Sequence, residues 1–187
     1  MSILEIISVI ISVIAVVLTI KRHIWCWFFN FIACVLYAIL FFQFKLYGET
    51  ILQVFFMVMA VYGYIQWKKG AVEHHILGIS NLSLIKTIQQ LIGGCIVGIG
   101  FGAVLANFTE ASVPWLDAQL AAFSLLATYW SSQKYLNTWR LWVVVDIIYI
   151  AMFIYKSLYL TAGLYAVFVI LAAMGWMQWQ KIYTQQK

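Results

Sequence analysis

Seven long apolar stretches dominate this sequence, and they constrain its fold more than any other feature. A helix needs about 20 mainly apolar residues to cross the hydrocarbon core of a bilayer. A membrane-spanning β-strand would instead alternate apolar and polar residues. We therefore predict an all-α membrane protein with seven transmembrane helices, at Ile3–Ile20, Ile24–Phe44, Thr50–Trp67, Leu84–Ala106, Trp115–Ser131, Thr138–Tyr155 and Leu160–Trp179.

The composition agrees with a lipid environment and argues against several other classes of protein. Hydrophobic residues make up 65% of the chain and charged residues only 9%, which is too little polar surface for a water-soluble domain of this size. The net charge of +5 is spread singly between apolar runs, so we expect no nucleic-acid partner. We find no phosphate-binding loop, zinc-protease motif or nucleophile elbow, and the three cysteines form no CxxC pair. We expect no cofactor, no metal ion and no enzymatic activity.

The basic residues are distributed unevenly between the breaks, which predicts the orientation. Seven spans put the two termini on opposite sides of the membrane, and one side has only Lys45 and Lys156. The positive-inside rule makes the other side cytoplasmic, so we expect the N-terminus outside and the C-terminus inside a bacterial inner membrane. The cytoplasmic side then carries Lys21, Arg22, Lys68, Lys69, Lys86, Lys134, Arg140, Lys181 and Lys187.

The first three spans resemble the last three. A shift of 112 positions, the separation of Trp27 from Trp139, aligns them without a gap. Apolar composition alone would not match the run Gly63-x-x-Gln66-Trp67 with Gly175-x-x-Gln178-Trp179. Duplication explains these identities better, together with the pairs Ser12/Ser124, Ala15/Ala127, Tyr37/Tyr149, Phe41/Phe153, Ala60/Ala172 and Lys69/Lys181.

The number of spans between the two repeats predicts how they face. One linker span gives both triplets the same orientation, as 3+1+3, with repeats at 1–69 and 113–187 and a cytoplasmic loop and linker helix at 70–112. Parallel repeats in transporters are related by an axis along the membrane normal, and substrate sites lie at their interface near the midplane. This arrangement favours alternating access.

One face of the sixth span carries the residues best suited to bind a cation. Trp139, Trp142 and Asp146 are spaced by three and four residues, so they share a helix face. An ionised carboxylate near mid-membrane costs at least ~3 kcal/mol unless it is compensated. A bound organic cation would compensate it, with about 0.5–2 kcal/mol of cation–π attraction per well-placed ring. The alternatives are an Asp146 that is protonated or hydrogen-bonded to a neighbouring helix.

Other polar residues inside the spans are weaker candidates for the same site. Asn30 lies on the equivalent face of the second span, about one turn inside the membrane, and needs a partner there. Each of these residues could contact a substrate or tie two helices together: Asn30, Gln53, Gln119 and Tyr149. We interpret Trp67, Trp176 and Trp179 as residues of an interfacial aromatic belt or as packing residues.

The pattern Trp139-x-x-Trp142-x-x-x-Asp146 resembles the W-x-x-W-x-x-x-N/D motif of the PnuC-type vitamin transporters. The segments Leu158-Tyr159-Leu160-Thr161-Ala162 and Gly175-Trp176-x-x-Trp179 are similar as well, and the resemblance covers nearly the whole chain. It implies a fold similar to a full-length relative of the sugar-transporting SWEET proteins, assembled as a homotrimer. It also implies facilitated diffusion of a vitamin precursor that a cytoplasmic kinase then traps, with Trp139, Trp142 and Asp146 lining the pocket.

The family includes transporters of several vitamins, and Asp146 stands where the motif also allows Asn. A carboxylate suits an aromatic cation, so we expect nicotinamide riboside first and thiamine next. Two alternatives remain open: a membrane sensor or scaffold, and an intramembrane enzyme that uses Asp146 as an acid or base. The enzyme would need a second catalytic group within reach, and none is apparent.

Overall fold

The structure is a computed structural model that describes residues 3–43, 47–72, 78–109, 113–155, 157 and 159–186. One helix corresponds to each predicted span, which confirms the all-α membrane architecture with seven helices. The helices are α1 (Ile3–Ile20), α2 (Trp25–Gln43), α3 (Tyr47–Val72), α4 (Leu84–Phe108), α5 (Pro114–Ser132), α6 (Asn137–Tyr155) and α7 (Tyr159–Gln185).

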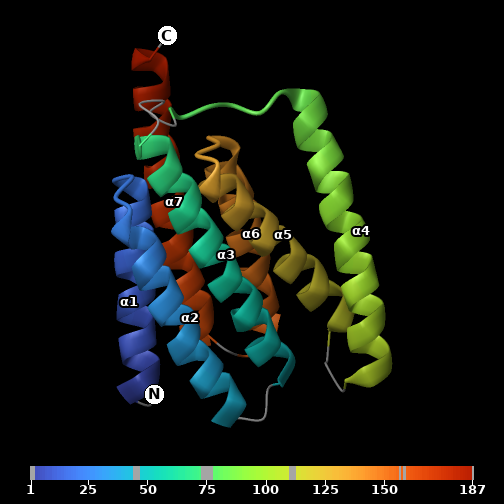
Figure 1. Cartoon of the computed structure of the whole chain (residues 1–187). Coiled ribbons are helices and arrows are strands. Elements are labelled where there is room, and N and C mark those ends of the chain that lie inside the picture. Colours follow the sequence, from blue (N-terminus) through green and yellow to red (C-terminus); the bar gives the residue numbers. More distant parts are fainter. Residues whose placement is uncertain are drawn as a thin grey trace.

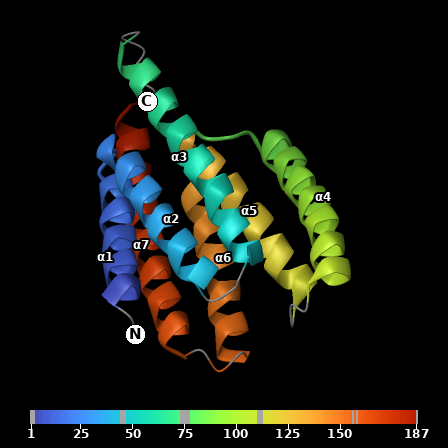
Figure 2. The same ribbon diagram turned by 60° about the horizontal axis from the view of Figure 1, so that its bottom comes forward.

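The helices form two three-helix groups with α4 at one edge (Figure 1). We call α1–α3 the first bundle and α5–α7 the second bundle. The two bundles meet where α1 contacts α7 and where α3 contacts α5. Helix α4 packs along α5, and the N-terminus and C-terminus of the chain lie at opposite ends of the molecule (Figures 1 and 2). We call the end at which α1, α3, α5 and α7 finish the basic end.

Six of the described helices are long and apolar enough to cross a membrane, and α5 is the exception. It is also extensively enclosed by protein, because it contacts α3, α4 and α6. A helix surrounded by other helices does not need an apolar face toward lipid, which explains why its sequence tolerates more small and polar residues. Its buried residues are Ala118, Leu120, Ala121, Ala122, Ser124, Ala127, Trp130, Ser131 and Ser132.

A stripe of glycines lets α4 approach α5 closely. Cβ atoms at Gly94, Gly98 and Gly102 would lie 3.1, 2.5 and 2.7 Å from atoms of Phe123, Gln119 and Trp115, one large side chain for each glycine. Helices in membranes associate through such small residues, because lipid tails give no hydrophobic drive for association. Gly94, Gly98 and Gly102 therefore serve close packing between the two helices.

The turns that join α1 to α2 and α5 to α6 have the same backbone geometry. Arg22 and Lys134, which are 112 positions apart, both adopt a left-handed conformation, with φ of 57° and 53°. Backbone hydrogen bonds repeat with the same shift: His23 N–H donates to Leu18 O at 2.9 Å, and Tyr135 N–H to Trp130 O at 3.0 Å. The sequence identity between the two groups of spans thus extends to local structure.

The segment before α4 packs onto the second of these turns. Ser80 N–H donates to Lys134 O at 3.2 Å, and Leu136 N–H donates to Ser80 O at 2.8 Å. Ile79 and Leu82 are buried beside this pairing. The contact holds the start of α4 against the basic end of the second bundle, where the sequence had predicted only a loop.

Candidate functional site

The predicted face of α6 points into the protein rather than toward lipid. Trp139 and Asp146 are each only 3% exposed. Trp142 is half-buried and packs against two clusters, one at the basic end and one between α5 and α6. The spacing read from the sequence therefore marks a face that α6 presents to neighbouring helices.

The carboxyl group of Asp146 has no compensating partner among the described residues. No hydrogen bond or ion pair in the described part of the chain involves its side chain. A buried charge without a partner is costly in a membrane, so such a group either stays protonated or binds a cation. Its burial rules out a carboxyl that points into lipid.

Trp139 is held by a glycine and a second tryptophan of α7. A Cβ atom at Gly175 would lie 2.6 Å from the Trp139 ring, so only glycine lets the indole lie against this helix. Trp179 meets the same ring edge-to-face, with centroids 5.3 Å apart and planes at 87°. The indole N–H of Trp139 is buried and has no hydrogen-bond partner among the described residues.

The first bundle contains the same arrangement. Trp27 lies against Gly63, where a Cβ atom would come within 2.4 Å of the ring. Trp67 meets Trp27 edge-to-face at 5.5 Å and 90°, and the Trp27 indole N–H is likewise buried and without a partner among the described residues. Each of these residues is related to its counterpart in α6 or α7 by the shift of 112 positions.

The four tryptophans belong to one buried cluster at the basic end, to which both bundles contribute. The outer pair is hydrogen-bonded across the bundle interface: Trp67 Nε1 donates to Ser131 O of α5 at 3.2 Å, and Trp179 Nε1 donates to Ile20 O of α1 at 3.0 Å. The cluster consists of Ile20, Cys26, Trp27, Ala60, Trp67, Ile79, Leu136, Trp139, Ala172 and Trp179.

This burial decides between the two interpretations of Trp67 and Trp179 that the sequence leaves open. Trp67 and Trp179 are 3% and 0% exposed, so they are packing residues and do not belong to an aromatic belt. Trp25, Trp115 and Tyr159, at other helix ends, are more than half exposed, as belt residues would be. Position along a span does not distinguish the two roles, whereas the repeated Gly-x-x-x-Trp spacing would have done so.

The remaining predicted residues lie on several helices. Asn30 on α2 and Gln53 on α3 are half-buried and have no side-chain hydrogen bond to any described residue. Tyr149 stacks with Phe153, with ring centres 5.8 Å apart, and meets the tilted ring of Tyr165 at 4.7 Å, which forms an aromatic group between α6 and α7. None of the described hydrogen bonds or ring contacts joins Asn30 or Gln53 to the face of α6.

Gln119 is engaged by α4. Its Nε2 donates to Cys95 O at 3.1 Å, and its Oε1 is buried without a partner among the described residues. The amide lies against Gly98, so Gln119 contributes to the close packing of α4 and α5 described above. The side-chain N–H of Gln119 that could bind a substrate is therefore already hydrogen-bonded to α4.

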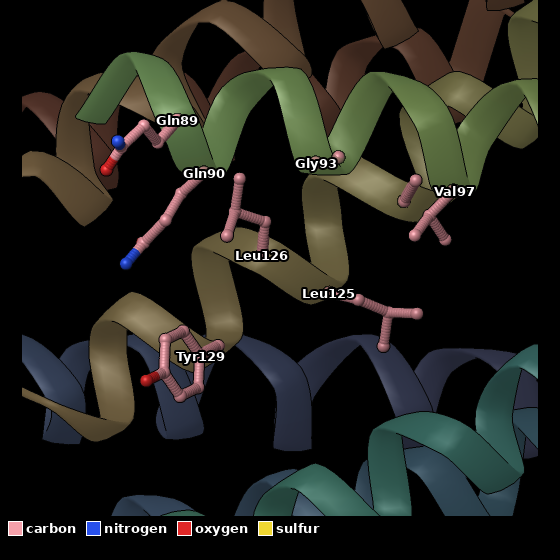
Figure 3. A pocket seen from close by; sticks show the side chains of 9 residues that line it. Gln89, Gln90, Gly93, Val97, Leu125, Leu126 and Tyr129 are labelled. Carbon is pink, nitrogen blue, oxygen red and sulfur yellow. The ribbon is translucent and has the colours of Figure 1, made fainter. Parts of the chain in front are cut away.

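Two clefts flank the contact between α4 and α5, and none of the predicted site residues lines either one. The first, of about 510 Å³, has Gln89, Gln90 and Tyr129 at one end and Val97 and Leu125 toward the other (Figure 3). The second, of about 600 Å³, involves α6 through a different face, on which Leu141, Val145 and Ile148 lie. At roughly 100° per residue this face is rotated well away from that of Trp139 and Asp146.

Two basic side chains lie close to tryptophan rings at the basic end. Lys134 Nζ lies 4.7 Å from the centre of the Trp67 ring, and the Arg140 guanidinium lies 4.9 Å from that of Trp176. Partial burial lowers the pKa of Lys134, and the charge of Arg22 lowers it further. The basic end therefore has positive charges within cation–π distance of tryptophan rings.

The family model described as "Nicotinamide mononucleotide transporter" matches residues 2–181. The chain belongs to this family. It is thus a multi-pass membrane protein of a transporter family and not an enzyme, as the sequence predicts, and the suspected PnuC-type resemblance is confirmed.

Relatives and a solved structure agree with this membership. The chain is 27% identical over 179 residues to proteins named "Nicotinamide riboside transporter PnuC" from Escherichia coli (strain K12) and Shigella flexneri, which covers 82% of this chain and 74% of each relative. It shares the fold of a structure titled "Crystal structure of the Vitamin B3 transporter PnuC", with a TM-score of 0.79, 21% identity, and coverage of 98% of this chain and 83% of that one.

Proposed function

We propose that this member of the family is a uniporter for nicotinamide riboside, with the substrate bound between the two bundles against Trp139, Trp142 and Asp146. The observation that carries the proposal is the buried, uncompensated carboxyl of Asp146 on an aromatic helix face. A pyridinium ring supplies the positive charge that this carboxylate lacks and the flat surface that stacks on indole. The names of the curated relatives favour the same substrate.

The charge of the site favours the riboside over the mononucleotide that the family description prints. A phosphate group would bring negative charge toward Asp146, and no lysine or arginine among the described residues is buried. An anion held beside a carboxylate without a basic partner is destabilised.

Thiamine, also an aromatic cation, is the second candidate for the substrate. Asn30, Gln53 and Tyr149 are proposed to contact the hydroxyl groups of the substrate, and Gln119 is the weakest candidate because α4 already engages its amide.

The proposed architecture is 3+1+3, with like-facing repeats at 1–69 and 113–187 joined by 70–112. Three features that recur at the shift of 112 positions support it: the turn at Arg22 and Lys134, the glycine–tryptophan contacts, and the Tyr37–Phe41 and Tyr149–Phe153 stacks. Rocking of one bundle against the other would then give alternating access. We further propose a homotrimer with the N-terminus outside and the basic end cytoplasmic, which native mass spectrometry and a C-terminal fluorescent fusion would test.

The test is binding and uptake by the purified protein in proteoliposomes. Thermal-shift titration with nicotinamide riboside, thiamine, riboflavin and nicotinamide mononucleotide should rank the riboside first. Trp142→Ala should abolish most saturable uptake, whereas Trp25→Ala, at an exposed tryptophan of α2, should not. The substrate assignment fails if thiamine binds more tightly than the riboside. The site fails if Trp142→Ala transports normally.

A further inference from the structure

The two hydrogen bonds that join the bundles at the basic end are reciprocal. Trp67, on the last helix of the first bundle, donates to α5, the first helix of the second bundle. Trp179, on the last helix of the second bundle, donates to α1, the first helix of the first bundle. The two donors are separated by the same 112 positions as the other repeated features.

Both acceptors are carbonyl groups in the final turn of a helix. Ile20 ends α1, and Ser131 is the second-last residue of α5. The last four carbonyls of a helix lack intrahelical donors, so they can accept an indole N–H without disturbing the helix. Each bond therefore ties the end of one bundle to a fixed point on the other.

The cluster around these bonds fills the space between the bundles. Trp67 and Trp179 are almost completely buried, and Cys26, in the same cluster, is 0% exposed. No substrate could pass between the bundles at this end while the cluster is packed in this way. The conformation described is thus closed at the basic end.

We propose that Trp67 and Trp179 form a paired latch that holds the cytoplasmic end of the transporter closed, and that opening toward the cytoplasm breaks both indole–carbonyl bonds together. This inference rests on the proposed transport function. Because each bond spans the interface between bundles, a rocking motion that separates the bundles at this end cannot keep either one. The equivalence of the two bonds makes the opening a single step rather than two independent ones.

Cys26 provides a reporter inside the latch. In a background with Cys34→Ala and Cys95→Ala, the reaction of Cys26 with N-ethylmaleimide in proteoliposomes measures how often the cluster opens. Replacing tryptophan with phenylalanine removes the indole N–H and keeps an aromatic ring. One neutral hydrogen bond changes a conformational equilibrium by roughly 2- to 12-fold. Trp67→Phe and Trp179→Phe should each accelerate labelling by about this factor, and the double variant by about the product.

Trp176→Phe is the matched control, since Trp176 lies on the same helix as Trp179, is 37% exposed and contacts Arg140 within the second bundle. Its labelling rate should equal that of the parent. The latch is overturned if the double variant labels at the parental rate, or if Trp176→Phe accelerates labelling equally. Should the double variant not fold, the two single variants decide. Labelling needs no substrate, so a protein that fails to transport nicotinamide riboside but responds at Cys26 refutes the substrate and leaves the latch intact.

Discussion

Asp146 is the residue on which the chemistry of the proposed site depends. Replacing it with asparagine keeps the size of the side chain and removes the negative charge. Opposite unit charges about 4 Å apart attract each other by about 1 kcal/mol in water and by more in a less polar site, so Asp146→Asn should weaken binding of nicotinamide riboside by roughly 5-fold or more. Isothermal titration with the purified protein measures the change, and Asp117→Asn, in the first turn of α5, serves as the control. An unchanged affinity would mean that Asp146 does not face the substrate.

Gly175 determines where the Trp139 indole can lie. An alanine Cβ at this position would overlap the ring at 2.6 Å, and overpacking of this kind costs about 1–3 kcal/mol. We expect Gly175→Ala to lower the thermal stability and to weaken substrate binding, because Trp139 must move. Gly163→Ala on the same helix, where a Cβ atom meets nothing within 4 Å, should leave substrate binding unchanged and should not lower the stability, because alanine favours a helix more than glycine does. Thermal unfolding followed with and without substrate separates the two effects, and equal behaviour of the two variants would contradict the proposed role of Gly175.

At the scale of single elements, the turn between α1 and α2 carries measurable backbone strain. Arg22 has a φ of 57°, and a left-handed conformation costs a residue other than glycine roughly 1–2 kcal/mol. Arg22→Gly should therefore leave the protein as stable as the parent or more stable. Lys21→Gly, at a neighbour without this conformation, should destabilise it by about 0.5–1 kcal/mol. Chemical denaturation of both variants in detergent gives the comparison, and a larger loss for Arg22→Gly would show that its side chain matters more than its backbone.

The elements differ in how well the sequence predicts them. The apolar runs alone locate all seven helices to within a few residues at most ends, because lipid requires a minimum length of apolar helix. Hydropathy identifies six of these helices as long and apolar enough to cross a membrane and leaves out α5. A helix enclosed by α3, α4 and α6 does not have to be apolar. The packing of Ile79 and Leu82 onto the α5–α6 turn depends on contacts between distant segments, which no local pattern encodes.

The candidate site was predictable only in part. Spacing on α6 correctly indicates that Trp139 and Asp146 are buried together on one side of the helix. Which residues of α2 and α3 face them depends on the rotation of those helices, and apolar sequences in a membrane give little information about rotation. The engagement of Gln119 by Cys95 O of α4 shows the consequence, because a polar residue in a span can satisfy a neighbouring helix as easily as a substrate.

The described part of the molecule offers few side chains that could couple transport to an ion gradient. Among the described residues Asp146 is the one buried acid, no lysine or arginine is buried, and no group of three or more acidic, histidine or cysteine side chains could hold a metal ion. A proton relay needs at least a second titratable group within reach. We therefore expect uptake into proteoliposomes to stop when the internal and external concentrations of nicotinamide riboside are equal, with no response to a pH or sodium gradient.

Enclosing a riboside kinase with ATP should raise the accumulated label several-fold above that level, because the phosphorylated product no longer fits a site with a carboxylate. The matched control is the same kinase without ATP. Accumulation above equilibrium in empty liposomes under a sodium gradient would contradict uniport and show that transport is coupled to the ion.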